Sequence, residues 1–108
     1  LGGGGGLGDL MKQAQQMQKK MAEMQEELAQ REVEASVGGG KVTVRANAGG
    51  DVLEIKIDPA VVDPDDVEML EDLVLSGVKQ AIEEGKAINQ EEMGKLTAGM
   101  GLPPGLGL

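Results

Sequence analysis

Lysine and glutamine side chains gather in the first third of the sequence. Lys12 and Lys19 are seven residues apart, Lys20 is adjacent, and glutamines surround them at positions 13, 15, 16, 18 and 25. Lysine supplies positive charge to phosphate groups and glutamine supplies hydrogen bonds, a combination that suits sequence-tolerant contact with a nucleic-acid backbone. The same pattern is also typical of a solvated helix face, and charge and spacing alone favour that simpler interpretation.

A run of carboxylates in the second half is a second candidate site. A hard divalent metal prefers clustered oxygen ligands, but the run lacks the central Gly and terminal Glu of a calcium-binding loop. Helix capping explains three of its members, so we expect no metal site here. The run consists of Asp58, Asp63, Asp65, Asp66 and Glu68.

Gly38-Gly39-Gly40-Lys41 superficially resembles a phosphate-binding loop. Val42 stands where such a loop requires Ser or Thr, and the residues that follow alternate as in a strand rather than a helix. A hairpin turn is therefore the better interpretation, although Lys41 at such a tip could still touch a DNA phosphate.

The composition excludes most catalytic chemistry. The chain has no Cys, His, Phe, Trp or Tyr, which removes thiolate nucleophiles, imidazole bases and the usual zinc sites. We therefore expect no enzyme, cofactor, metal or small-molecule substrate.

No segment is apolar enough to span a bilayer, and the start LGGGGGLGDL does not resemble a signal peptide, so we expect a cytoplasmic protein. A core without aromatic side chains is thin, which favours a homodimer.

The charge is unevenly distributed along the chain. The net charge is -9, yet residues 1–50 are balanced, with six basic and six acidic residues, and the second half carries the whole excess. A polyanion is expected to approach the N-terminal half and to be repelled by the rest.

The lysines are expected to lie on a long helix. Apolar residues recur at alternating intervals of three and four, which is a heptad seam that requires a second helix as a partner, either from the same chain or from the second copy in a dimer. We expect the helix to run from a cap at Asp9 to Gln30. The seam consists of Leu7, Leu10, Ala14, Met17, Met21, Met24 and Leu28.

Three alternating segments follow and predict an antiparallel meander with one apolar face. They are centred on Ala35, Val44 and Ile55. Matching the apolar faces places Val37 opposite Val42, Ala35 and Ile55 opposite Val44, and Glu34 and Glu54 on either side of Arg45. Arg45 should then be neutralised by its neighbours.

A second long helix is predicted after Asp63-Pro64, with Asp63 as its cap and helical character toward Gly99. Its apolar stripe is wide enough to cover the sheet and also to touch the first helix. The expected organisation is a flexible glycine-rich segment (1–6), one α+β domain (7–99) with the order α-β-β-β-α, and a mobile Pro/Gly tail (100–108).

Three stretches of this sequence resemble the YbaB/EbfC family of bacterial nucleoid-associated proteins. They are LGDLMKQAQQMQ at 7–18 with the seam up to Leu28, IDP at 57–59 with EMLEDLV at 68–74, and GMGLPPG at 99–105. The five glycines replace the Met-Phe-Gly-Lys-like start that is usual in the family.

The resemblance implies a tweezer-like homodimer that binds double-stranded DNA in the nucleoid, with roles in gene expression, nucleoid organisation or recombination and repair. We carry DNA contact over to basic positions only. The alternative is a protein-binding adaptor or chaperone-like dimer that uses the methionine seam, and its binding would be insensitive to salt. The positions predicted to contact DNA are Lys12, Lys19, Lys20, Arg31 and Lys41.

Overall fold

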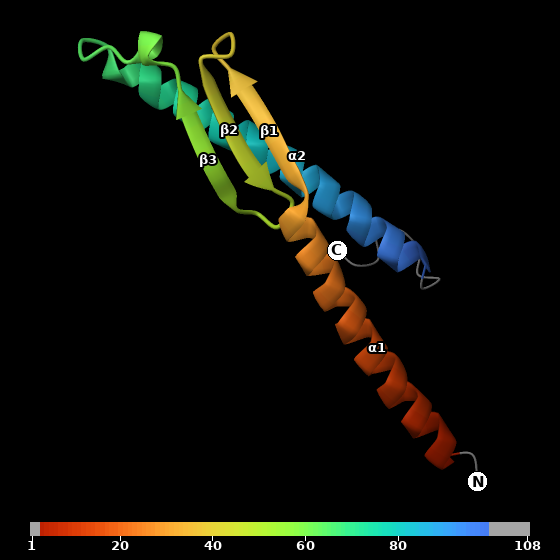
Figure 1. Cartoon of the computed structure of the whole chain (residues 1–108). Helices are drawn as coiled ribbons and strands as arrows, with labels where there is room; N and C mark the ends of the chain where they lie inside the picture. The colour runs from red at the N-terminus through yellow and green to blue at the C-terminus, as the bar shows by residue number, and fades with distance from the viewer. Residues whose placement is uncertain (1–2, 100–108) are drawn as a thin grey trace.

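The computed structural model confirms the α-β-β-β-α order in an elongated molecule of 78 × 22 × 17 Å (Figure 1). It describes residues 3–99, with side chains for 6–98, so the expected tail at 100–108 lies outside the described residues. The elements are α1 (Gly3–Gln30), β1 (Glu32–Val37), β2 (Val42–Asn47), β3 (Val52–Ile57), a short 3-10 helix η1 (Pro59–Val61) and α2 (Val67–Gly99).

Helix α1 begins six residues before the predicted cap. It starts at Gly3 and ends at Gln30, so Asp9 lies within the helix and the prediction of a cap at Asp9 is wrong. Adding residues to an existing helix gains one hydrogen bond each without a new nucleation cost, which allows the glycines to join. At the other end, the Arg31 amide donates to the Leu28 carbonyl at 3.1 Å, and the chain enters β1 at once.

The predicted strand register is confirmed. The sheet order is β1-β2-β3, with Val37 opposite Val42, and Ala35 and Ile55 opposite Val44. A bulge between Arg45 and Ala46 shifts the pairing at the start of β3, where Val52 lies opposite Ala46. The turn between β1 and β2 contains three successive glycines with positive φ, at residues 38–40, as a tight hairpin requires.

Arg45 is neutralised, but by a different first partner than expected. Glu34 is its register partner, whereas the guanidinium bonds Glu32 on β1 and Glu54 on β3. The hydrogen bond to Glu32 is the main cause that raises the pKa of Arg45 above its ordinary value. The face of the sheet away from α2 is therefore polar and internally compensated.

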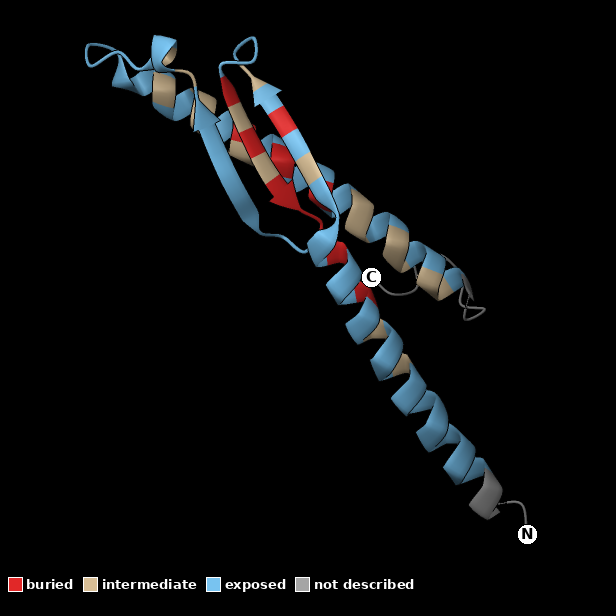
Figure 2. Ribbon diagram, viewed as in Figure 1, coloured by how far each residue is buried: buried red, intermediate tan, exposed pale blue. Residues whose placement is uncertain are grey.

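Helix α2 packs across one face of the sheet, mainly over β1 and β2 (Figure 2). The core there comprises Ala35, Val42, Val44 and Ala46 from the strands and Ala81 from the helix, all buried. Two glycines permit this close approach. A Cβ on Gly77 would lie 2.9 Å from Val44 Cγ2, and one on Gly85 would lie 2.5 Å from the Asn47 carbonyl oxygen.

Helix α2 begins at Val67 rather than directly after Asp63, so the predicted cap is wrong by three residues. Asp63 instead forms a turn in which its carbonyl accepts from the Asp66 amide at 3.0 Å. Asp66 is the residue that caps the helix, because its Oδ1 accepts from the Met69 amide at 3.3 Å. Continuation of the helix to Gly99 is confirmed.

The seam of α1 is covered only at its C-terminal end. Met24 and Leu28 are buried with Ala48, and Met93 and Leu96 of α2 pack against them. Toward the N-terminus α1 projects away from the rest of the molecule, and its surface is exposed apart from the half-buried Met17 and Met21 (Figure 2). Helix α1 is therefore an arm held at one end.

Candidate nucleic-acid interface

The three lysines of α1 lie on the projecting arm. Lys12, Lys19 and Lys20 are exposed, and no salt bridge between described residues involves them. At 100° per residue, Lys12 and Lys19 lie on the face opposite the apolar stripe, and Lys20 lies on its flank. Up to Lys20 the arm therefore carries three unpaired lysines against one acid, Asp9, whereas Glu23, Glu26 and Glu27 follow toward its root.

The other two predicted contact residues lie elsewhere and are paired. Arg31 is at the root of α1, where its Nη1 is 3.6 Å from Glu92 Oε1. Lys41 follows the β1–β2 turn, at the end of the sheet that points away from α1 (Figure 1), and its Nζ is 3.3 Å from Asp58 Oδ2. The structure thus brings together Lys12, Lys19 and Lys20 and separates Lys41 from them.

A buried amide fixes the arm to the body. Asn47 is 4% exposed, and its Nδ2 donates to the carbonyl of Ala29 in the last turn of α1 at 3.0 Å. Its Oδ1 accepts from the Asp51 amide at 2.9 Å, which closes the β2–β3 turn. Asn89 of α2 donates to the Ala48 carbonyl at 3.0 Å and fastens the same turn to the second helix. Three elements therefore meet at this point.

Sequence reasoning missed the role of Asn47. The residue stands in Asn-Ala-Gly-Gly-Asp, where a turn already explains an asparagine. The signal that could have distinguished it is its position, since Asn47 ends an alternating strand whose neighbours Val44 and Ala46 are buried. A polar residue that is buried in this way requires partners, and α1 supplies one.

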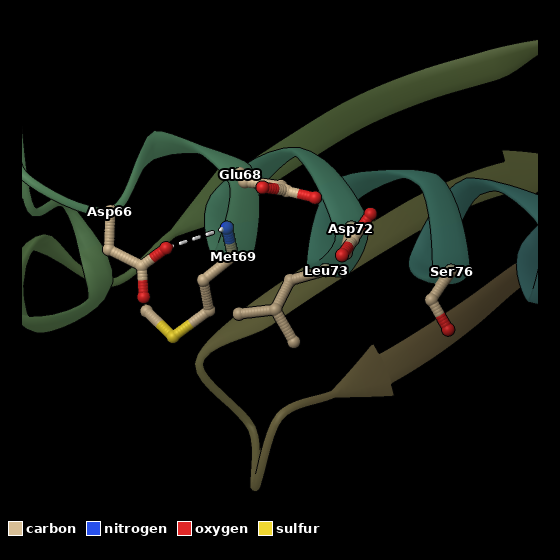
Figure 3. Close-up of a pocket in the computed structure, with 6 residues that line it drawn as sticks. All are labelled: Asp66, Glu68, Met69, Asp72, Leu73 and Ser76. Carbon is tan, nitrogen blue, oxygen red and sulfur yellow. Dashed lines mark hydrogen bonds between the residues drawn. The ribbon is translucent and has the colours of Figure 1, made fainter.

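The acidic run lies at the opposite end of the molecule from the arm. Asp66, Glu68 and Asp72 line an open groove of about 550 Å³ at the start of α2 (Figure 3). In Figure 3 the Asp66 carboxylate is engaged with the Met69 amide rather than turned toward the other two acids. Among the described residues no group of acids is arranged to hold a metal ion.

Asp58 and Asp63 also serve the backbone. Asp58 Oδ1 accepts from the Ala60 amide and Asp63 Oδ1 from the Asp65 amide, each at 2.9 Å. The bond from Ala60, and after it the bond from Lys41, lowers the pKa of the Asp58 carboxyl below its ordinary value. Asp58 and Asp66 thus cap helices, as predicted for members of the run, whereas Asp63 binds a backbone amide within a turn and not at a helix start.

The described helices include none that is long and apolar enough to cross a membrane.

Fold and charge together define a small α+β protein that carries its unpaired α1 lysines on a projecting helix. The model of the YbaB/EbfC DNA-binding family matches residues 3–100, and the chain belongs to this family.

Curated relatives cover nearly the whole chain. A nucleoid-associated protein of Clostridium perfringens is 55% identical over 102 residues, which is 94% of this chain and 91% of the relative. One of Acetivibrio thermocellus is 51% identical over 105 residues, covering 97% and 93%. The crystal structure of an uncharacterized protein from Helicobacter pylori superposes with a TM-score of 0.63 at 19% identity, covering 74% of this chain and 93% of that one, and shows the same fold.

Proposed function

We propose that the protein binds duplex DNA as a homodimer, mainly through the phosphate backbone, with Lys12, Lys19 and Lys20 as the principal contacts. The observation that carries this proposal is the position of these unpaired lysines on the projecting face of α1. Curated relatives are named nucleoid-associated proteins, which supports a place in the bacterial nucleoid and a binding rather than a catalytic role. Effects on gene expression, nucleoid organisation or recombination and repair would follow from that binding.

The charge distribution supports contact through the arm rather than through the body. The outer face of the sheet is compensated around Arg45, and the far end of the molecule is acidic. A polyanion therefore meets attraction at residues 3–20 of α1, which carry three lysines and one acid, and repulsion at the start of α2. Arg31 lies close enough to the arm to join a longer contact, whereas Lys41 does not share that surface.

The surface proposed for dimerisation is the β3 edge together with the adjacent flank of α2. Every residue of β3 is exposed, including Leu53, Ile55 and Ile57 at 42%, 42% and 38%. Ile55 and Ile57 pair directly with the buried Val44 and Val42 and so share the face on which α2 lies. An exposed apolar edge strand is normally covered, and a second copy of this chain would cover it.

The flank of α2 continues the same apolar surface. Ile57 lines an open groove of about 480 Å³ with Leu75 and Val78 of α2, and Ile82, 39% exposed, follows one turn further. Leu75→Glu combined with Ile82→Glu should shift the sedimentation coefficient from dimer to monomer. Met11→Glu, at a 59% exposed position on α1, is the control and should leave the dimer intact. A wild-type chain that sediments as a folded monomer at micromolar concentration would contradict the dimer.

The DNA contact is tested by two charge-matched double variants. Lys12→Glu/Lys19→Glu and Lys79→Glu/Lys86→Glu each reverse two exposed lysines that are seven residues apart on a helix. Fluorescence anisotropy of labelled duplex DNA should show at least a tenfold weaker affinity for the α1 variant and a small change for the α2 variant. Sedimentation checks that both variants keep the oligomeric state of the wild type. If both variants weaken the affinity for DNA equally, the effect is one of net charge alone, and the assignment of the DNA contact to α1 is refuted.

Salt dependence separates DNA binding from the adaptor alternative. Each phosphate contact contributes about -0.9 to the slope of log affinity against log salt concentration. Changing Lys12, Lys19 and Lys20 to Gln removes up to six contacts from a dimer, so the slope should become less negative by up to about 5. Absence of DNA binding even at low salt would favour the protein-binding adaptor.

A further inference from the structure

The N-terminal part of α1 carries an apolar stripe that no described residue covers. We call Leu7, Leu10, Ala14 and Met17 the distal stripe. Leu7 and Leu10 are each 63% exposed. The stripe continues the line of Met21, Met24 and Leu28, which α2 covers at the root. Exposed apolar residues that form one continuous line mark an interaction surface.

The covered part of the seam ends where α2 ends. Leu96 packs against the Met24 and Leu28 cluster, and it lines a hollow together with Lys20 and Met24 of α1. Because α2 runs roughly antiparallel to α1 (Figure 1), the chain beyond Leu96 continues in the direction of the tip of α1, and Gly99 follows Leu96 by about one turn. The chain therefore leaves α2 within reach of the uncovered surface.

We propose that residues 100–108 of the same chain dock along the distal stripe. Their sequence, MGLPPGLGL, contains no charged side chain and has apolar residues at Met100, Leu102, Leu106 and Leu108. Pro103 and Pro104 prevent α2 from continuing as a helix, so the segment covers the stripe in extended form. Extended chain rises about 3.1 Å per residue and helix about 1.5 Å, so nine residues reach the roughly 15 Å from Met17 to Leu7 with length to spare.

The geometry favours the tail over an arm of a second molecule. The tail is tethered beside the stripe, so its effective concentration is on the order of millimolar, whereas another molecule must associate from solution. Docking also leaves the lysines free, because Lys12 and Lys19 lie on the opposite face of α1. The proposed DNA contact and the docked tail are therefore compatible, and neither depends on the other.

Disulfide formation tests the docking directly, because the chain contains no cysteine of its own. The variant Leu10→Cys/Leu102→Cys joins two positions that docking brings to about the same level of α1, because three extended residues beyond Gly99 rise roughly 9 Å and the seven helical residues from Met17 to Leu10 rise roughly 10 Å. Gln15→Cys/Leu102→Cys is the control, since residue 15 lies on the other side of the helix. Far-UV circular dichroism confirms that both variants are folded before oxidation.

The first pair should oxidise at least ten times faster than the control pair and give a cross-link within one chain, seen as a faster monomer band on a non-reducing gel. Equal rates for the two pairs would overturn the proposal, as would a disulfide that forms between two chains when Leu10→Cys and Leu102→Cys single variants are mixed.

Hydrogen exchange of the chain without residues 100–108 provides a second measurement. Loss of the docked tail should accelerate amide exchange several-fold in residues 7–17 of α1 and leave residues 24–30 unchanged, because α2 still covers the root. Unchanged exchange along the whole of α1 would also overturn the proposal.

Discussion

Gly85 provides a quantitative test of how α2 lies on the sheet. In an isolated helix, Gly→Ala stabilises by about 1 kcal/mol, because alanine has the higher helix propensity. At Gly85 the new Cβ would lie 2.5 Å from the Asn47 carbonyl oxygen and 3.2 Å from its carbon, both of which are backbone atoms. Relieving such a contact forces α2 and the β2–β3 turn apart.

Overpacking of this kind lowers the free energy of unfolding by about 1–3 kcal/mol. The cost of a contact with backbone atoms falls toward the upper end of this range, because the backbone cannot rotate away as a side chain can. We therefore expect Gly85→Ala to lower the free energy of unfolding by about 1–2 kcal/mol after the gain in propensity. Gly94→Ala is the matched control, because Gly94 is in the same helix and a Cβ added there would have nothing within 4 Å. It should raise the free energy of unfolding by about 1 kcal/mol.

Urea unfolding followed by circular dichroism at 222 nm measures both variants, and the protein concentration is kept constant because the proposed dimer contributes to stability. Fluorescence is unsuitable because the chain has no aromatic residue. If Gly85→Ala stabilises the protein as much as Gly94→Ala does, then α2 does not approach the turn as closely as described, and the explanation of this glycine is refuted.

Two other perturbations follow from the same contacts. Asn47→Ala removes the bonds to the Ala29 carbonyl and the Asp51 amide, and it should cost about 2 kcal/mol in urea unfolding. Asn89→Ala removes one bond from a less buried side chain and should cost about half as much, so an equal or larger cost would contradict the central role of Asn47. The pKa of Asp58 is lower in the folded state, so its carboxylate stabilises the fold above about pH 4 and this contribution disappears as the pH falls through the lowered value. Asp58→Asn should consequently lower the melting temperature at pH 6, and its difference from the wild type should shrink progressively as the pH falls below about 4, so a constant difference across that range would count against the ion-pair and capping roles.

Local patterns predicted the sheet well because register depends on short-range features. Two hairpins with short turns and one apolar face leave a single pairing that keeps Val42 and Val44 inside. The strand register did not predict which glutamate bonds the Arg45 guanidinium. A long guanidinium reaches diagonally, so it bonds Glu32 instead of the directly opposite Glu34.

Helix boundaries and the root of the arm depended on tertiary contacts that the pattern does not contain. The start of α2 could not be predicted, because the sequence pattern does not show that the chain makes a separate turn at Asp63 before the helix begins. Asn47 carried no periodic signal, because its importance comes from Ala29, 18 residues earlier. For the candidate site, the lysines were recognised by type and spacing, while the separation of Lys41 from α1 follows from the path of the β1 strand.

The single attachment of α1 makes the arm a lever. From Met21 to Gly3 it extends about 27 Å beyond its last packed turn, so a rotation of roughly 10° at the root moves the tip by roughly 5 Å. In a dimer with two such arms, the opening between the tips changes by as much as twice that distance. Lys12, about 14 Å beyond Met21, moves by about half as much as the tip, whereas Lys19 and Lys20 lie close to Met21 and move little. Substitutions in the β2–β3 turn should therefore change where Lys12 meets a phosphate without replacing any of the proposed contact residues.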